Sequence, residues 1–393
     1  MYKHIYFDFT CCYEIAGNFG RFSGATNYAS VIFKHLIKQA VSGINIHAVL
    51  PQGSDKNDLS DLGISMDNEQ VRMKYVTDIK YIVVKEEDAL LFIPAVYGGN
   101  LIKIPQIKNR NPHLRIYATL HDRQHNYYKY DWLDRFYHGN NIVLEIPGYI
   151  KYLIKKGIFN AVYPECVSYI DKIFTVSNYS MQMLENKRVK NIKFFIQGNV
   201  LEEYTGECER QNFVLLVGGG REEKNLLRTL IAFCKYKKET GSDLKFVTTG
   251  VKNAMKKKIK SCRLLDKEII KKDVYFREYI DYSELSELYS KCKFVVFTSK
   301  GEGYGLPVLE ALSYGKAVLA SRTTSVPEVA GASIMYCDPF SVDSIVMGFQ
   351  NMDNDDSLNL MEDYIKDKYV LIKAGSELDM QILCKDLQGL NAI

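Results

Sequence analysis

A strand followed by a glycine-bearing loop and a helix occurs twice in this chain. Residues 4–9 (HIYFDF) have the pattern of a strand, a stretch with several glycines follows, and the helical pattern ATNYASVIFKHLIKQ comes next. The second occurrence begins with the strand pattern 213–217 (FVLLV), continues through glycines 218–220 and ends in the helical pattern EKNLLRTLIAFCKYKKE. This succession opens the α/β folds that bind nucleotides, so we expect two related halves.

Strand and helix patterns alternate through the rest of the chain. Further strands are predicted at 45–50, 88–93, 115–120, 171–176, 244–249, 273–276, 293–298 and 317–320. Several are nearly continuous β-branched or aromatic runs, which is typical of parallel strands buried on both faces. We therefore predict an α/β fold of two Rossmann-like, doubly wound domains, residues 1–200 and 201–370, joined near the polar stretch 197–212. Residues 371–393 read as a C-terminal helical tail, and packing back on the first domain is one option for it.

Length and composition exclude several classes of protein. The 393 residues correspond to about 2.6 domains at roughly 150 residues each. An apolar content of 47% excludes global disorder, and a net charge of +4 is too weak to indicate a nucleic-acid partner. No apolar run approaches the ~18 residues of a membrane span, and the first residues lack the pattern of a signal peptide. The nine cysteines include no C-x-x-C pair, which favours free thiols in a reducing cytoplasm.

The most informative segment is 297–321, FTSKGEGYGLPVLEALSYGKAVLAS. A strand ends here, a loop with alternating glycines follows, and Pro307 takes a favoured first-turn position of the next helix. Free N–H groups at such a helix start bind phosphate. Glu302 lies in the loop and Glu310 in the helix, and ionised carboxylates accept hydrogen bonds from vicinal hydroxyls. A ligand with both phosphate and diols, such as a sugar nucleotide, fits this combination.

The same segment resembles a known family. Glu302 and Glu310 match the Glu-x7-Glu signature of retaining GT-B glycosyltransferases, in particular glycosyltransferase family four. The similarity extends over 282–345, including Ser325-Val326-Pro327-Glu328, and over 217–233 and 171–180. It is strong in the second half and looser in the first. The resemblance implies the GT-B fold, with two Rossmann-like domains facing a cleft.

The resemblance also implies roles for individual residues. Catalytic roles fall on Glu302, which would hold the donor sugar, on His121 and on Lys224, which would neutralise the departing diphosphate. The expected donor-binding set is Gly24, Gly218, Gly219, Arg221, Lys224, Gly303, Tyr304, Gly305, Leu306 and Glu310. The family arginine would fall at Gly219, and Arg221 lies two positions later. Two interpretations of Arg221 stay open: it reaches the same phosphate by another route, or it is solvated.

No metal or other cofactor is expected. His121 and His125 have a helical i, i+4 spacing, but no third ligand is apparent and the resembled fold usually needs no metal. Asp353-Asn354-Asp355 formally fits the Asp-x-Asp motif of metal-dependent glycosyltransferases, yet it lies in an acidic stretch late in the chain. We interpret it as a solvated loop or a helix cap.

The acceptor is expected to bind the first half. Asp122 and Trp132 belong to the aromatic stretch 122–139, for which acceptor stacking and core packing are equal alternatives. Segment 150–159 (IKYLIKKGIF) is basic and apolar. It has two interpretations, contact with an anionic membrane surface or a solvated helix face with exposed lysines.

The implied reaction is metal-independent transfer from a nucleotide diphosphate sugar to a hydroxyl of a glycan or lipid-linked glycan, with retained configuration. Cell-surface polysaccharide synthesis is the expected setting. The alternatives are a GT-B epimerase or phosphorylase, and an inactive homologue that serves as a partner subunit. A dinucleotide dehydrogenase is disfavoured because GGGREE lacks the pattern G-x-G-x-x-G.

Overall fold

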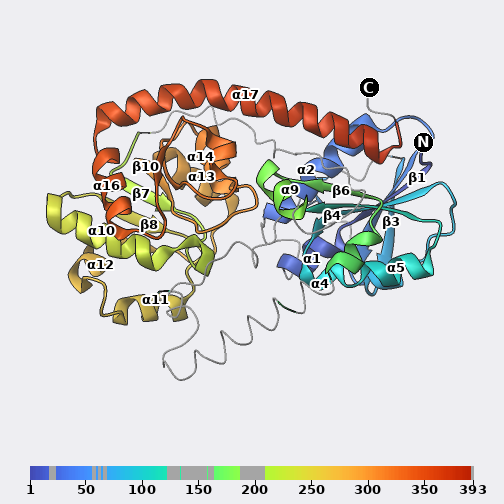
Figure 1. The fold of residues 1–393 in the computed structure, drawn as a ribbon, viewed down its shortest axis with the longest axis horizontal. Coiled ribbons are helices and arrows are strands. Elements are labelled where there is room, and N and C mark those ends of the chain that lie inside the picture. Colours follow the sequence, from blue (N-terminus) through green and yellow to red (C-terminus); the bar gives the residue numbers. More distant parts are fainter. Residues whose placement is uncertain are drawn as a thin grey trace. The chain divides into compact units, whose positions relative to one another are not determined.

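The computed structural model describes residues 1–16, 24–54, 59–60, 63–64, 69–121, 133, 157, 163–185 and 209–390. These residues form two compact units. The first takes the described residues within Met1–Arg123, Ile154–Val200 and Lys373–Ile393, and the second those within Gln124–Leu153 and Leu201–Ile372. Each unit is a parallel sheet with helices (Figure 1).

The sheet of the first unit has six parallel strands in the order β3-β2-β1-β4-β5-β6. Their bounds are β1 His4–Asp8, β2 Asn45–Pro51, β3 Val71–Val76, β4 Ala89–Val96, β5 Arg115–Leu120 and β6 Lys172–Thr175. The helices are α1 Thr10–Ala16, α2 Gly24–Gln39, η1 Ile79–Tyr81, α4 Gly98–Leu101, α5 Ile104–Arg110 and α9 Asn178–Glu185. The strand order reverses between β1 and β4, which is the doubly wound arrangement.

The second unit repeats this arrangement with the strand order β12-β11-β10-β7-β8-β9. Its strands are β7 Phe213–Leu216, β8 Lys245–Thr248, β9 Val274–Phe276, β10 Phe294–Phe297, β11 Val318–Ser321 and β12 Met335–Cys337. Its helices are η3 Glu222–Lys224, α10 Leu226–Thr240, α11 Asn253–Ser261, α12 Lys267–Asp273, α13 Tyr282–Lys291, α14 Leu306–Ser313, α15 Val326–Ala330 and α16 Val342–Met352. The prediction of two doubly wound parallel-sheet halves is confirmed.

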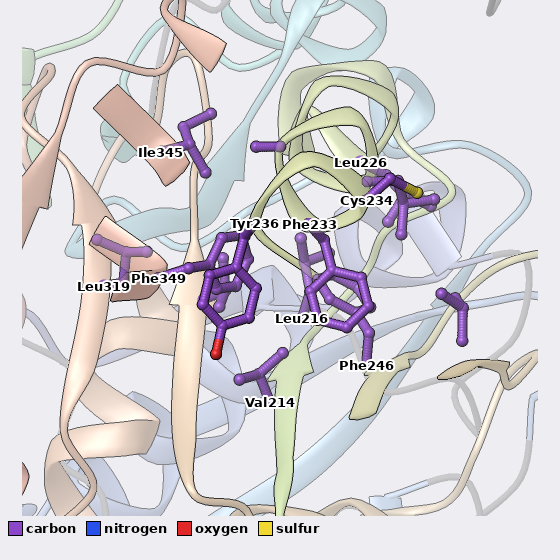
Figure 2. Close-up of a cluster of buried hydrophobic side chains, with 14 of the residues drawn as sticks. Val214, Leu216, Leu226, Phe233, Cys234, Tyr236, Phe246, Leu319, Ile345 and Phe349 are labelled. Atoms are coloured by element: carbon purple, nitrogen blue, oxygen red, sulfur yellow. The ribbon is translucent and has the colours of Figure 1, made fainter. Parts of the chain in front are cut away.

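Both faces of the second sheet are buried, as the nearly continuous apolar strands indicate. On one face Val214 and Leu216 pack against Phe233 of α10 and Phe349 of α16 (Figure 2). On the other face Leu215 belongs to a cluster that includes residues of α13 and α14. Because successive side chains of a strand point to opposite faces of the sheet, one strand contributes to two separate hydrophobic cores.

The structure differs from the sequence expectations in three elements. Strands β3 and β12 were not predicted, because β3 is an edge strand with exposed Arg72 and Tyr75 and β12 has only three residues. Helix α17, Asp355–Leu387, is one continuous helix, so the acidic stretch begins it and the predicted start near 371 falls inside it. Its last turns belong to the first unit, where Asp386 pairs with Lys172 at 2.5 Å.

Within the described part of the chain, no helix has the length and apolar character to cross a bilayer. Segment 150–159 lies outside the described residues apart from Gly157.

Candidate active site

The two glycine loops of the second unit follow neighbouring strands. Strand β7 leads into Gly218–Gly220 and β10 leads into residues 299–305, and the two strands pair in parallel. The strand order of this sheet reverses between β10 and β7. Ligands of open α/β sheets bind outside the carboxyl ends of the strands at such a reversal, so this is the candidate site.

A buried ion pair joins the two loops. Lys224 Nζ lies 2.7 Å from Glu302 Oε1, and the residues are only 4% and 8% exposed. The hydroxyl of Ser299 donates to the same oxygen at 2.5 Å. Both donors converge on Oε1, and Oε2 has no hydrogen-bond partner among the described residues. The carboxylate therefore keeps one oxygen that can accept from a ligand.

Hydrogen bonds also hold the residues on either side of Lys224. Glu223, the residue before the lysine, accepts at its carbonyl from the Lys300 N–H at 2.8 Å, and the hydroxyl oxygen of Ser299 lies 3.0 Å from the same carbonyl oxygen. Asn225, the residue after it, has a left-handed backbone with φ 60° and ends the short helix η3. Its side-chain amide donates to the carbonyls of Thr298 and Pro339 at 3.1 and 2.7 Å. These contacts join the loop after β7 to the end of β10.

Burial and charge act in opposite directions on the pair. Burial raises the pKa of Glu302, but the charges of Lys224 and Arg221 and the hydrogen bonds to its carboxylate outweigh burial and leave that pKa below its usual value. Burial lowers the pKa of Lys224, and Glu302 opposes that shift. The depressed pKa of Glu302 means that its carboxylate is ionised at neutral pH.

The glycine loop leads directly into α14. Gly305 has φ 105°, a conformation that favours glycine, and it is the residue before Leu306, where α14 begins with Pro307 in its first turn. Glu310 lies in this helix, and its Oε2 accepts a hydrogen bond from the Tyr289 hydroxyl at 2.6 Å. Burial raises the pKa of Glu310, although Tyr289 and Lys224 partly oppose the shift.

Neighbouring side chains fill the space at Gly219, the position where the family arginine would fall. A Cβ atom at Gly219 would lie 2.4 Å from Thr248 Oγ1, so a larger residue there requires a shift of the Thr248 side chain. Arg221 is 59% exposed at its side chain, and its Nε lies 3.0 Å from Glu223 Oε1. Its charge nevertheless lowers the pKa of both Lys224 and Glu302, which places it near the pair.

The first unit holds two of the predicted residues. Gly24 begins α2, and His121 follows β5. His121 Nε2 lies 2.9 Å from the Pro94 carbonyl, which only accepts, so Nε2 carries the proton and Nδ1 is the acceptor of the neutral ring. Burial lowers the pKa of His121 to about 4. The ring of Tyr28 contacts the imidazole edge-on at 4.6 Å between centroids.

The other candidates divide into two groups. Asp122, His125 and Trp132 lie outside the described residues, so their predicted roles stay predictions. Asp353 is described, and its carboxylate accepts from Tyr236, from Ser242 at 3.0 Å and from Lys293 at 2.8 Å. These contacts join the residue after α16 to α10 and to the residue before β10.

Sequence reasoning missed several residues of the site. They are Asn225, Tyr289, Ser299, Thr324 and Ser325. Asn225, Tyr289, Thr324 and Ser325 act on segments that are distant in the chain, so no local spacing gives them these contacts, whereas Ser299 lies only three residues before Glu302. A Ser at a strand end and an Asn after a Lys are common residues in common places.

Comparisons with known proteins agree with this geometry. The family model "Glycosyl transferases group 1" matches residues 181–369. O-antigen chain mannosyltransferase B of Escherichia coli is 25% identical over 313 residues, which cover 66% of this chain and 81% of that protein. O-antigen chain mannosyltransferase RfbU of Salmonella typhimurium is 24% identical over 240 residues, 58% of this chain and 62% of that protein.

Solved structures share the fold at low sequence identity. HepE of Anabaena, in a complex with UDP and glucose, has a TM-score of 0.65 at 12% identity and covers 99% of this chain and 100% of its own. TarM of S. aureus has a TM-score of 0.55 at 16% identity over 79% of this chain, which spans 57% of the TarM chain. The family match and these likenesses lead to one identification: residues 181–369 match the group 1 glycosyltransferases, and the chain has the GT-B fold.

Proposed function

We propose that this glycosyltransferase is retaining and metal-independent, and that it moves a sugar from a nucleoside diphosphate sugar to a hydroxyl of a glycan or lipid-linked glycan in cell-surface polysaccharide assembly. The observation that carries the proposal is the buried Lys224–Glu302 pair at the point where the strand order reverses. Two relatives named as O-antigen mannosyltransferases make a nucleoside diphosphate mannose the first donor to test.

In this proposal each charge has a place in the reaction. The bond between the sugar C1 and the diphosphate oxygen breaks, and a bond from C1 to the acceptor oxygen forms on the same face. The acceptor proton passes to the departing diphosphate, whose developing charge Lys224 and Arg221 stabilise. Glu302 accepts from a sugar hydroxyl at Oε2, and Glu310 accepts from the ribose hydroxyls. Lys224 and Arg221 thereby supply the positive charge that a metal ion supplies in other transferases.

His121 and Gly24 keep their expected roles toward the donor in this proposal. The neutral imidazole offers Nδ1 as an acceptor, since its Nε2 proton is held by Pro94. A low pKa keeps this tautomer neutral through the physiological range, so a sugar hydroxyl is a suitable donor to it. Gly24 would allow close approach of backbone to the diphosphate at the start of α2.

The test is a panel of nucleoside diphosphate sugars with and without EDTA, measured by release of nucleoside diphosphate. We expect one donor, most directly the mannose donor, to be hydrolysed slowly without acceptor and to be unaffected by EDTA. NMR of the product with an added glycan acceptor then gives the anomeric configuration. An inverted product would refute retention, EDTA sensitivity would refute metal independence, and glycan cleavage that requires phosphate would identify a phosphorylase instead.

A further inference from the structure

The backbone of the glycine loop is held from behind by two adjacent hydroxyl residues. The Glu302 N–H donates to Thr324 Oγ1 at 3.0 Å. The Ser325 hydroxyl, fully buried, approaches the carbonyls of Glu302 and Tyr304 at 3.0 and 2.9 Å. Both peptide groups of Glu302 are therefore bound by this pair of residues, which we call the hydroxyl clamp.

Ser325 occupies the N-cap position of α15, where a serine side chain normally caps the helix. It is the residue before α15, a position whose side chain usually accepts from the first N–H groups of the helix. Here the side chain makes no such capping bond, and its proton goes to the glycine loop. The contact to the loop therefore takes the place of the ordinary local interaction.

Thr324 has an unfavourable backbone. Its φ of 53° is left-handed, which is uncommon for any residue with a side chain and an outlier for a β-branched one. Among the described residues, only Asn225 is a second non-glycine with positive φ, and it directly follows Lys224. Both strained residues thus adjoin the Lys224–Glu302 pair. Strain of this kind persists where the surroundings over-determine the conformation, and it clusters at functional sites.

We propose that Thr324 is a positioning residue for the transferase reaction: its hydroxyl fixes the peptide of Glu302 and thereby aims the carboxylate. This inference rests on the proposed role of Glu302 at the donor sugar. The carboxylate is already held at Oε1 by Lys224 and Ser299, so the peptide contact determines where Oε2 points. Misplacement of a reacting partner by about 1 Å can cost on the order of a hundredfold in rate.

Two variants separate the hydroxyl from the backbone. Thr324→Gly accepts the left-handed φ without strain and removes only the side chain. Thr324→Ser keeps the hydroxyl. We expect kcat of the glycine variant to fall by roughly ten- to a hundredfold and that of the serine variant to stay within about threefold of wild type. The dissociation constant of the nucleoside diphosphate, measured by calorimetry, should stay within about twofold in both, because Glu302 is aimed at the sugar.

A readout independent of catalysis keeps this inference distinct from the proposed function. Hydrogen exchange of the Glu302 amide should be faster in Thr324→Gly than in wild type or Thr324→Ser. Unchanged exchange, a serine variant as slow as the glycine variant, or nucleotide affinity that falls in parallel with kcat would each overturn the positioning role. Absence of transfer by the wild-type enzyme with every donor would instead refute the proposed function, and the exchange measurement would still decide whether the clamp exists.

Discussion

The Lys224–Glu302 pair allows stability and activity to be separated by mutation. Lys224→Met removes the cation and leaves Glu302, 8% exposed, without its ion-pair partner. Removing one member of a buried pair costs about 3–5 kcal/mol, because the other charge stays uncompensated. In a unit of this size each kcal/mol shifts Tm by about 2–4 °C, so we expect Tm to fall by roughly 6–20 °C at pH 7.

The double variant is the decisive comparison. In Lys224→Met/Glu302→Gln no charge remains in the buried position, so most of the lost stability should return. The amide oxygen that this substitution introduces is still able to accept from Ser299. Transfer should be lost in the double variant and in both single variants, since the proposed reaction needs the cation and the carboxylate. Thermal unfolding by calorimetry and nucleoside diphosphate release measure the two properties separately.

The contribution of Glu302 to stability depends on pH in a direction that follows from its pKa. The wild-type pKa of Glu302 is depressed, so its contribution to stability is present above the unfolded pKa near 4.3 and is lost as pH falls through the folded pKa. In Lys224→Met the same pKa should rise, because the charge and the hydrogen bond of Lys224 no longer oppose burial. The stability deficit of that variant should therefore shrink as pH falls from 7 toward 5. A wild-type Tm in Lys224→Met, a double variant no more stable than the single ones, or near-normal turnover in any of them would refute the reasoning.

Three further predictions concern other positions. Gly219→Ala should destabilise the protein by about 1–3 kcal/mol in urea unfolding, because its Cβ meets a close neighbour. The matched control is Gly375→Ala, within α17, where a Cβ meets no other atom; this variant should be more stable by about 0.5–1 kcal/mol. The folded pKa of His121, about 4, lies below the unfolded value near 6.5, so the stability of the protein falls as pH drops through that window. In His121→Asn this loss of stability, measured by calorimetry, should be smaller by up to about 3 kcal/mol. Tyr289→Phe removes the hydrogen bond to Glu310 and should cost about 1–3 kcal/mol in urea unfolding, while unchanged stability would show that the bond adds nothing.

Sequence patterns were sufficient for the parts of the site that depend on local order. The β10 strand, the glycines and the two glutamates are consecutive in the chain, so their arrangement follows from one strand–loop–helix unit. Lys224 follows a similar unit after β7. The ion pair between Lys224 and Glu302 was not predicted, because it joins two loops 78 positions apart and depends on β7 and β10 being neighbours in the sheet.

The displaced arginine shows why some questions need the structure. From the sequence, Arg221 had two interpretations, and nothing in its neighbours decided between them. In the structure the side chains of Thr248 and two leucines fill the space at Gly219, and the half-exposed side chain of Arg221 contacts Glu223. The same limit applies to Thr324, whose backbone strain and contact with Glu302 arise from a loop 22 positions further along the chain.

The two glutamates of the motif differ in a way that indicates binding rather than acid–base work. Glu302 has a depressed pKa, so it is ionised at neutral pH and is unsuited to donate a proton. Glu310 has a raised pKa, but Tyr289 already donates to its Oε2. Each carboxylate thus has one oxygen occupied by a protein donor, while the other has no hydrogen-bond partner among the described residues. Two carboxyl oxygens that can accept, beside a buried cation, match a ligand that brings hydroxyl donors and a diphosphate together.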